Sequence, residues 1–157
     1  MEQTIRFATT PDGVKLAFAS SGQGLPLLKT ANWLNHLDFD WQSPVWSHWF
    51  RLFSTHNTLY RYDGRGSGLS DWTNDKLDFE QQVRDLEFVA ESARLPRFAL
   101  LGISQGASVA IEYAARHPER VSHLVVHGGF ARKAKTLVLH SRGDLVVPVG
   151  AGAGRKP

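Results

Sequence analysis

The segment Gly102-Ile103-Ser104-Gln105-Gly106 constrains the fold of this chain more than any other. The apolar run at 98–101 before it indicates a buried parallel strand, and residues 107–116 after it are typical of a helix. A serine at so sharp a strand-to-helix turn has a strained backbone, and the flanking glycines remove side chains that would clash there. We therefore expect Ser104 to be a nucleophile that stands beside helix N–H groups able to bind an oxyanion. The alternative is a glycine-rich turn in which Ser104 only caps the helix.

The rest of the chain alternates between strand and helix patterns. We expect an opening hairpin, further strands, and two helices besides the one after Ser104. The hairpin strands lie at 5–8 and 14–19, the further strands at 25–29, 57–62, 121–126 and 136–139, and the helices at 45–53 and 79–92. This order predicts an α/β fold, with a mostly parallel sheet covered by helices on both faces. We expect one domain over residues 1–148 and a flexible tail over 149–157.

Composition excludes several classes of function. The chain has 157 residues and a net charge of +3, and its basic residues are scattered, which argues against a nucleic-acid partner. It has no cysteine, so disulfides, thiolate metal sites and cysteine nucleophiles are excluded. We expect no cofactor and no metal. The sequence starts without an apolar leader and has no stretch of transmembrane length, so we expect a cytoplasmic protein with no membrane partner.

Three segments together resemble the α/β-hydrolase fold superfamily. They are the loop Asp63-Gly64-Arg65-Gly66-Ser67-Gly68-Leu69-Ser70, the turn around Ser104, and Leu139-His140-Ser141-Arg142-Gly143-Asp144. The resemblance covers residues 1–148. It implies that Ser104 is the nucleophile and that Asp144 is the acid that orients the catalytic base. It also implies that the Gln105 N–H is one oxyanion donor and that a second lies around Asn32 and Trp33. The alternative for Asp144 is a solvated acid in a turn.

The chain departs from the family pattern in two respects. It resembles a member truncated at the C-terminus and without a cap, because it lacks the family's inserted cap, its final strand and the histidine that follows that strand. A serine needs a base to take its proton, and two of the seven histidines, His36 and His127, are placed to lie near Ser104. For each of the two, the alternative is a histidine without a catalytic role, either hydrogen-bonded within the fold or merely exposed to solvent. A base from a partner subunit is a further possibility.

The seven residues 128–134 separate two strands that are expected to be parallel. A crossover between parallel strands in one sheet needs a dozen or more residues. We therefore expect the strand at 136–139 either to pair with a second chain, bringing Asp144 to the partner's nucleophile, or to fold back antiparallel. The first possibility predicts a homodimer formed by strand exchange.

The sequence most favours a serine carboxylesterase that acts on small-molecule, short-chain acyl esters. Five aromatic residues are candidates either for an acyl pocket or for core packing: Trp33, Trp41, Trp46, Trp49 and Phe50. A hydrolase-like scaffold or dimerisation module without catalysis is the main alternative. A cofactor-free perhydrolase or haloperoxidase is a weaker one.

Overall fold

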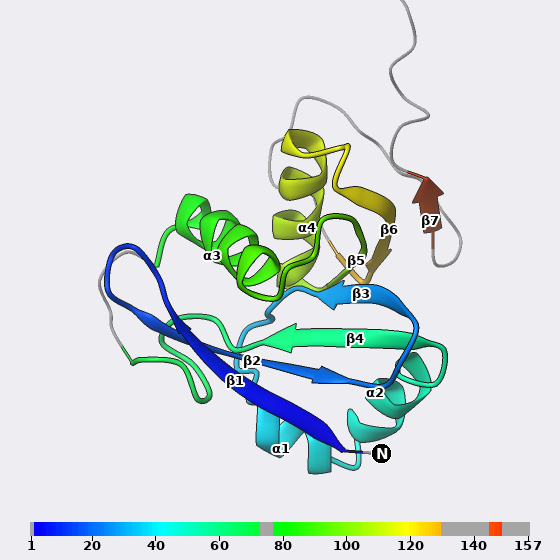
Figure 1. Ribbon diagram of the computed structural model, residues 1–157, viewed down its shortest axis with the longest axis horizontal. Coiled ribbons are helices and arrows are strands. Elements are labelled where there is room, and N and C mark those ends of the chain that lie inside the picture. Colours follow the sequence, from blue (N-terminus) through cyan, green and yellow to red (C-terminus); the bar gives the residue numbers. More distant parts are fainter. Residues whose placement is uncertain (1, 73–76, 130–144, 149–157) are drawn as a thin grey trace, which may run out of the picture.

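The computed structural model describes residues 2–72, 77–129 and 145–148 (Figure 1). Its strands are β1 (Gln3–Thr9), β2 (Lys15–Ser21), β3 (Leu25–Lys29), β4 (Asn57–Tyr62), β5 (Phe98–Ile103), β6 (Val121–His127) and β7 (Leu145–Pro148). Its helices are α1 (Leu37–Gln42), α2 (Ser47–Phe53), α3 (Phe79–Ser92) and α4 (Gln105–Arg116). The strands form one seven-stranded sheet in the order β1-β2-β4-β3-β5-β6-β7.

The centre of the sheet is parallel and its two sides are antiparallel. Strands β4, β3, β5 and β6 run parallel to one another, whereas β1 and β2 form the expected hairpin and β7 pairs antiparallel with β6. In the hairpin turn, Gly13 takes a φ of 88°, which a residue without Cβ adopts at little cost. The carboxyl ends of β3 and β5 lie side by side, so that the loops after them meet at one edge of the sheet.

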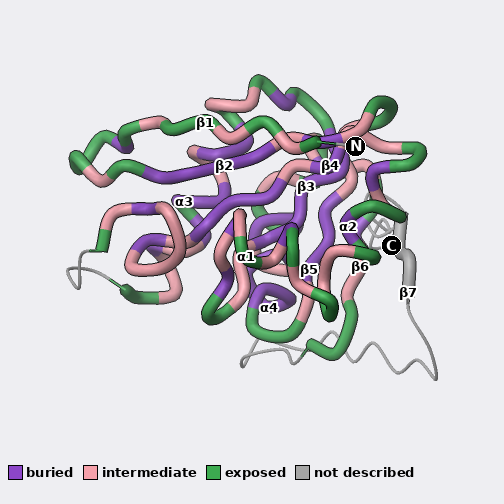
Figure 2. Tube along the Cα trace, turned by 90° about the horizontal axis from the view of Figure 1, so that it is seen from below, coloured by how far each residue is buried: buried purple, intermediate pink, exposed green. Residues whose placement is uncertain are grey.

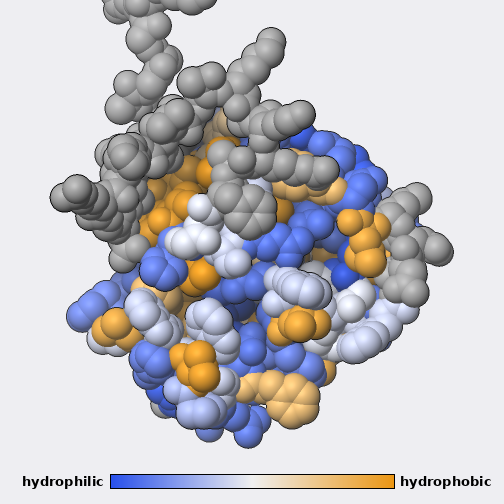
Figure 3. All heavy atoms as spheres, turned by 180° about the vertical axis from the view of Figure 1, so that it is seen from behind, coloured by the Kyte–Doolittle hydropathy of each residue, from blue (hydrophilic) through white to orange (hydrophobic). Residues whose placement is uncertain are grey.

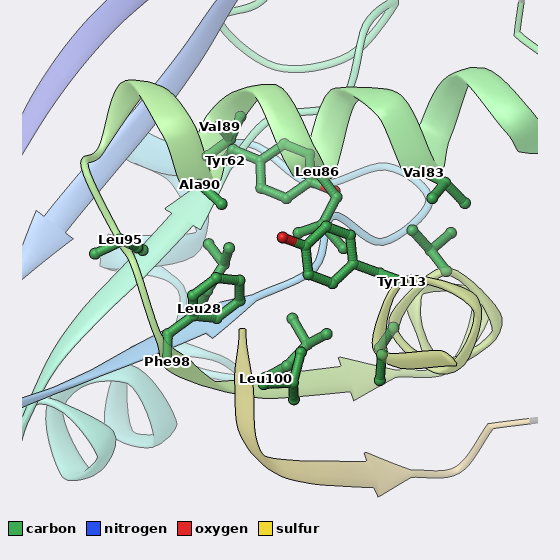
Figure 4. Packing of buried hydrophobic residues seen from close by; sticks show 14 of the residues in the cluster. Leu28, Tyr62, Val83, Leu86, Val89, Ala90, Leu95, Phe98, Leu100 and Tyr113 are labelled. Carbon is green, nitrogen blue, oxygen red and sulfur yellow. The ribbon is translucent and has the colours of Figure 1, made fainter. Parts of the chain in front are cut away.

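Helices cover both faces of the sheet, as expected for this fold class (Figure 1). Helices α3 and α4 pack on one face, where Leu28 and Leu100 of the strands meet Leu86 and Tyr113 of the helices (Figure 4). Helices α1 and α2 pack on the other face around Phe50. Figure 2 shows that most residues of β3 and β5, in the middle of the sheet, are buried, whereas β1 at the edge has only intermediate and exposed residues. Burial of such apolar area is the main force that holds α/β layers together.

Most elements lie where the sequence predicted them. The strand Asn57–Tyr62 and the helix Phe79–Ser92 coincide with their predicted bounds, and the fold class is confirmed. The predicted helix at 45–53 begins later, at Ser47, and α1 was not predicted. The predicted strand at 136–139 lies outside the described residues. Strand β7, which was not predicted, follows it in the chain.

Candidate active site

Ser104 lies between β5 and α4 with the strained backbone that the sequence predicted. Its φ is 53° and its ψ is −122°, a conformation that a residue with a Cβ rarely adopts. The residue is exposed to solvent. Within the described part of the chain, its hydroxyl makes no capping hydrogen bond to the helix, so the capping alternative does not explain the serine. The turn therefore presents a hydroxyl at the carboxyl edge of the sheet.

The two flanking glycines permit two close approaches. A Cβ on Gly102 would lie 2.7 Å from Ala107 Cα, so the missing side chain lets α4 pack directly on β5. A Cβ on Gly106 would lie 2.7 Å from the Ala31 carbonyl oxygen and would overlap Thr30 Oγ1. The second glycine therefore allows the loop after β3 to rest against the first turn of α4. Real Cβ atoms do not approach backbone this closely, so neither position has room for another residue.

The loop after β3 is fixed to the turn by Thr30. The Thr30 N–H donates to the Leu101 carbonyl at 2.9 Å, and its hydroxyl donates to the Gly106 carbonyl at 3.1 Å. The three predicted oxyanion residues, Gln105, Asn32 and Trp33, line a common hollow of about 300 Å³. Gln105 is the first residue of α4, and the first N–H groups of a helix have no partner within it. The hollow is thus a place where a negative oxygen can receive backbone donors.

Ser104 itself lines a different, apolar cavity of about 480 Å³ on the α2 side of the sheet. Side chains of β3, β5, β6 and α2 form its walls, among them Leu27, Ile103, Val125, Trp46, Trp49 and Phe53. His127, the last residue of β6, lines the same cavity, and its ring lies 6.4 Å from that of Trp49. Of the five aromatic candidates for an acyl pocket, Trp46 and Trp49 are found here. Trp41 and Phe50 are buried in the core, and Trp33 lies in the other hollow.

The remaining predicted site residues are placed differently. His36 is the N-cap residue of α1, where its Nδ1 accepts hydrogen bonds from the N–H groups of Asp38 (3.2 Å) and Phe39 (3.4 Å). A neutral imidazole whose Nδ1 accepts carries its proton on Nε2, so this ring has no lone pair left for a base. The structure therefore gives His36 a capping role. Asp144 lies outside the described residues.

The glycine-rich loop from Asp63 to Ser70 is organised by a buried carboxylate. Asp63 accepts hydrogen bonds from Leu69 N–H (2.8 Å), Leu37 N–H (3.1 Å) and Asn35 Nδ2 (2.6 Å). Burial raises the pKa of this carboxyl group, and the two backbone donors act in the opposite direction. Gly68 has a φ of 54° and leaves no room for a Cβ beside the carboxylate. The resemblance pointed to this loop, and its visible role is structural.

Arg65 of the same loop forms a buried ion-pair cluster. Its guanidinium binds Asp85 of α3 in bidentate fashion, at 2.8 and 2.7 Å, and Asp12 of the hairpin turn at 2.9 Å. The Arg65 side chain is 2% exposed. Hydrogen bonds from Arg65 and Thr10 lower the pKa of Asp12. The cluster ties three separate segments of the chain together, and Arg65 and Asp85 also line the hollow that Gln105 lines.

A second, largely buried cluster of charged residues, which was not predicted from the sequence, lies at the start of the loop after β3. It contains Lys29 and Arg61, which lie opposite each other on β3 and β4, together with Asp40 and Asp63. The sequence did contain a signal for this cluster. A lysine directly after an apolar run that is predicted to be a buried strand is unusual, because lysine is rarely buried without a partner. The Arg61 guanidinium lies 4.0 Å from the centre of the Phe50 ring, a cation–π contact.

The described residues offer neither a metal-binding cluster nor a membrane-spanning helix. Nowhere in these residues do three or more histidine or acidic side chains gather as a metal would require. No helix in the same ranges has both the length and the apolar character needed to cross a membrane.

The family model and the relatives that match this chain agree with the fold described above. Residues 36–148 match the model of the alpha/beta hydrolase fold family. The chain is 30% identical over 113 residues to AB hydrolase superfamily protein YisY of Bacillus subtilis, covering 71% of this chain and 40% of that protein. It is 32% identical over 85 residues to pyrrolizixenacetamide deacetylase of Xenorhabdus hominickii, covering 54% of this chain and 32% of the deacetylase. The chain thus spans well under half the length of both relatives.

Solved structures agree on the fold. Cfl2 from Burkholderia cenocepacia superposes with a TM-score of 0.70 at 25% identity, covering 86% of this chain and 46% of Cfl2. A putative lipase from Acinetobacter baumannii superposes with a TM-score of 0.69 at 21% identity, covering 86% of this chain and 45% of the lipase.

Proposed function

The chain belongs to the alpha/beta hydrolase fold family, and from this premise we propose that it is a serine hydrolase, a carboxylesterase for short-chain acyl esters. One observation carries the proposal. Ser104 stands exposed, at a φ of 53°, on a strand-to-helix turn and lines a cavity that His127 also lines. Strain of this kind is kept where the function needs the side chain held in an otherwise unfavourable position.

In the proposed reaction, Ser104 Oγ attacks the ester carbonyl carbon and forms a tetrahedral intermediate. The negative oxygen receives the Gln105 N–H and an N–H from Asn32 or Trp33, which line one hollow with Gln105. The C–O bond of the leaving group then breaks, the alcohol departs, and an acyl-enzyme remains on Ser104. Water hydrolyses this ester and releases the acid.

The base in this proposal is His127. It removes the hydroxyl proton of Ser104 and returns it to the departing alcohol, as a histidine does in acyl transfer. Support comes from the position of His127 at the end of β6, beside the turn, and from the cavity that both residues line. His36 is not used, because its Nδ1 is already an acceptor in the cap of α1.

The apolar cavity provides a site for the acyl group. Its volume of about 480 Å³ lies within the range of small-molecule sites. Its walls are hydrocarbon and indole, which favour an apolar acyl chain over a charged one. The relatives whose names specify a reaction include a deacetylase, which removes a short acyl group, and a lipase.

The test is hydrolysis of p-nitrophenyl acetate and butyrate by the whole chain and by its Ser104→Ala variant. The proposal predicts turnover that the substitution abolishes. Ser108→Ala is the matched control, since Ser108 is a buried serine one turn along α4 whose hydroxyl bonds to the Gln105 carbonyl. Equal rates in the wild type and Ser104→Ala would instead support the non-catalytic scaffold.

A further inference from the structure

Lys29 is a buried lysine that the proposed reaction leaves unused. It is the last residue of β3, and only 5% of it is exposed. Its Nζ donates a hydrogen bond to the Thr30 carbonyl oxygen at 3.0 Å. Lysine is almost never buried to this degree without a partner, so the position calls for a role. The peptide that it contacts leads directly into the loop that carries Asn32.

Charged groups face Lys29 from several elements. Arg61 lies opposite it on β4, Asp40 comes from α1, and Asp63 follows β4. Burial, and after it the nearby Arg61, lower the pKa of Lys29 to about 7, although the two carboxylates act in the opposite direction. Lys29 therefore exchanges its proton near neutral pH rather than near the ordinary lysine value of 10.5.

A small hollow of about 40 Å³ adjoins this amine. Lys29, Asn32, Asn35 and Asp40 supply its polar lining. Among the described residues, three buried side-chain polar atoms lack a hydrogen-bond partner, and Asn32 Oδ1 and Asn35 Oδ1 are two of them. An ammonium group has three N–H donors, and the Thr30 carbonyl accepts one. The hollow exceeds the volume that one water molecule needs, so water can receive the remaining N–H donors of the ammonium.

We propose that Lys29 is a positioning residue for the loop 30–33: its buried ammonium holds the Thr30 carbonyl, from which this loop begins. The inference rests on the proposed function, because in that proposal the loop supplies an N–H group that binds the oxyanion. Hydrogen bonds from an ionised donor are about twice as strong as neutral ones. Loss of the Lys29 proton therefore loosens the loop against Gly106 and turns its N–H groups away from the oxyanion.

The structural test does not depend on hydrolysis. Backbone amide signals of Ala31 and Asn32 are followed by NMR between pH 5.5 and 9.5 in the whole chain carrying Ser104→Ala. We expect both signals to titrate with a midpoint near the pKa of about 7. Lys29→Met, which keeps the length of the side chain without its charge, is expected to abolish that midpoint. Lys15→Met, at an exposed lysine, is expected to leave it unchanged.

The inference is overturned if the two amide signals still titrate with this midpoint in Lys29→Met. It is also overturned if they do not titrate when Lys29 is intact. If Lys29→Met does not fold, Lys29→Arg decides, since arginine stays charged and is expected to hold the two signals constant over this range. A midpoint that remains in Lys29→Arg likewise overturns it.

The kinetic test uses p-nitrophenyl butyrate. We expect the ratio of wild-type kcat to Lys29→Arg kcat to fall as the pH rises through the pKa of Lys29, because only the wild type loses this charge whereas both proteins keep the base His127. Lys29→Met is expected to lower kcat at least about tenfold at pH 6 with KM little changed, since a misplaced donor weakens the transition state rather than binding. Unchanged kcat contradicts the inference. Hydrolysis that survives in Ser104→Ala contradicts the proposed nucleophile instead and leaves the NMR result standing.

Discussion

The backbone N–H of Ser104 donates a 3.0 Å hydrogen bond to the carbonyl oxygen of His127. This bond continues the parallel pairing of β5 and β6 beyond Ile103, the residue opposite His127 in the register. It fixes the start of the turn against the end of the neighbouring strand. The nucleophile and the proposed base are therefore held by the same backbone ladder, which limits how far either can drift.

His127→Ala is expected to lower kcat for p-nitrophenyl butyrate about 10²- to 10⁴-fold, the usual contribution of a general base. The physical reason is that the Ser104 hydroxyl loses its proton acceptor. His36→Ala is the control, because it removes the cap of α1 and is expected to lower the melting temperature while the rate per folded molecule stays the same. A rate that depends on His36 and not on His127 would contradict the assignment.

Gly106→Ala is expected to reduce both stability and hydrolysis. A methyl group there would meet the Ala31 carbonyl at 2.7 Å, and the loop 30–33 must move away from α4 to admit it. Overpacking of this kind costs about 1–3 kcal/mol, measurable by urea unfolding. Gly64→Ala is the matched control, since its Cβ would lie an ordinary 3.5 Å from Ala31 Cβ. Similar effects of the two substitutions would show that the close approach at Gly106 has no special role.

Asp85→Ala is expected to destabilise the fold by about 3–5 kcal/mol, because it leaves the buried Arg65 guanidinium without its bidentate partner. Glu80→Ala, which removes an exposed partner of Arg116, is expected to cost far less, because water screens this ion pair. Comparable losses in urea unfolding would contradict this ranking.

Acid pH acts on the same cluster through Asp12. Folding lowers the pKa of Asp12, so this carboxylate stabilises the folded protein at pH values above its ordinary pKa of 3.8. That stabilisation is lost as the pH falls from 3.8 through the lowered pKa. Asp12→Asn is expected to flatten this part of the stability profile, whereas an unchanged acid limb would exclude Asp12 as its source.

The dimer expected from the sequence remains a proposal. Two exposed apolar side chains, Val45 and Trp49, line the apolar cavity, and Leu52 of α2 is exposed as well; together they offer a surface for association. Figure 3 shows hydrophobic side chains among hydrophilic ones on the face seen from behind. Size-exclusion chromatography with light scattering at micromolar concentration is expected to give twice the monomer mass of 17.5 kDa. A clean monomer would contradict the dimer and the exchange of strands.

The sequence predicted those features that depend on local pattern. Helix α3 follows from apolar residues at helical spacing, and the turn at Ser104 from two glycines at fixed distances from a serine. Helix α1 was missed because it has six residues and begins at a histidine rather than at a common capping residue. The His36 cap is a local contact, but histidine is an uncommon capping residue, so the pattern did not reveal it. The burial of Lys29 depends on packing against segments distant in sequence, which periodicity does not encode.

The most direct test of the account is covalent labelling of the whole chain with a fluorophosphonate, which reacts with activated serines. Intact-protein mass spectrometry and peptide mapping are expected to find one adduct, on Ser104, and none after heat denaturation. An unlabelled protein, or an adduct elsewhere with Ser104 unmodified, would contradict the claim that this turn presents an activated nucleophile.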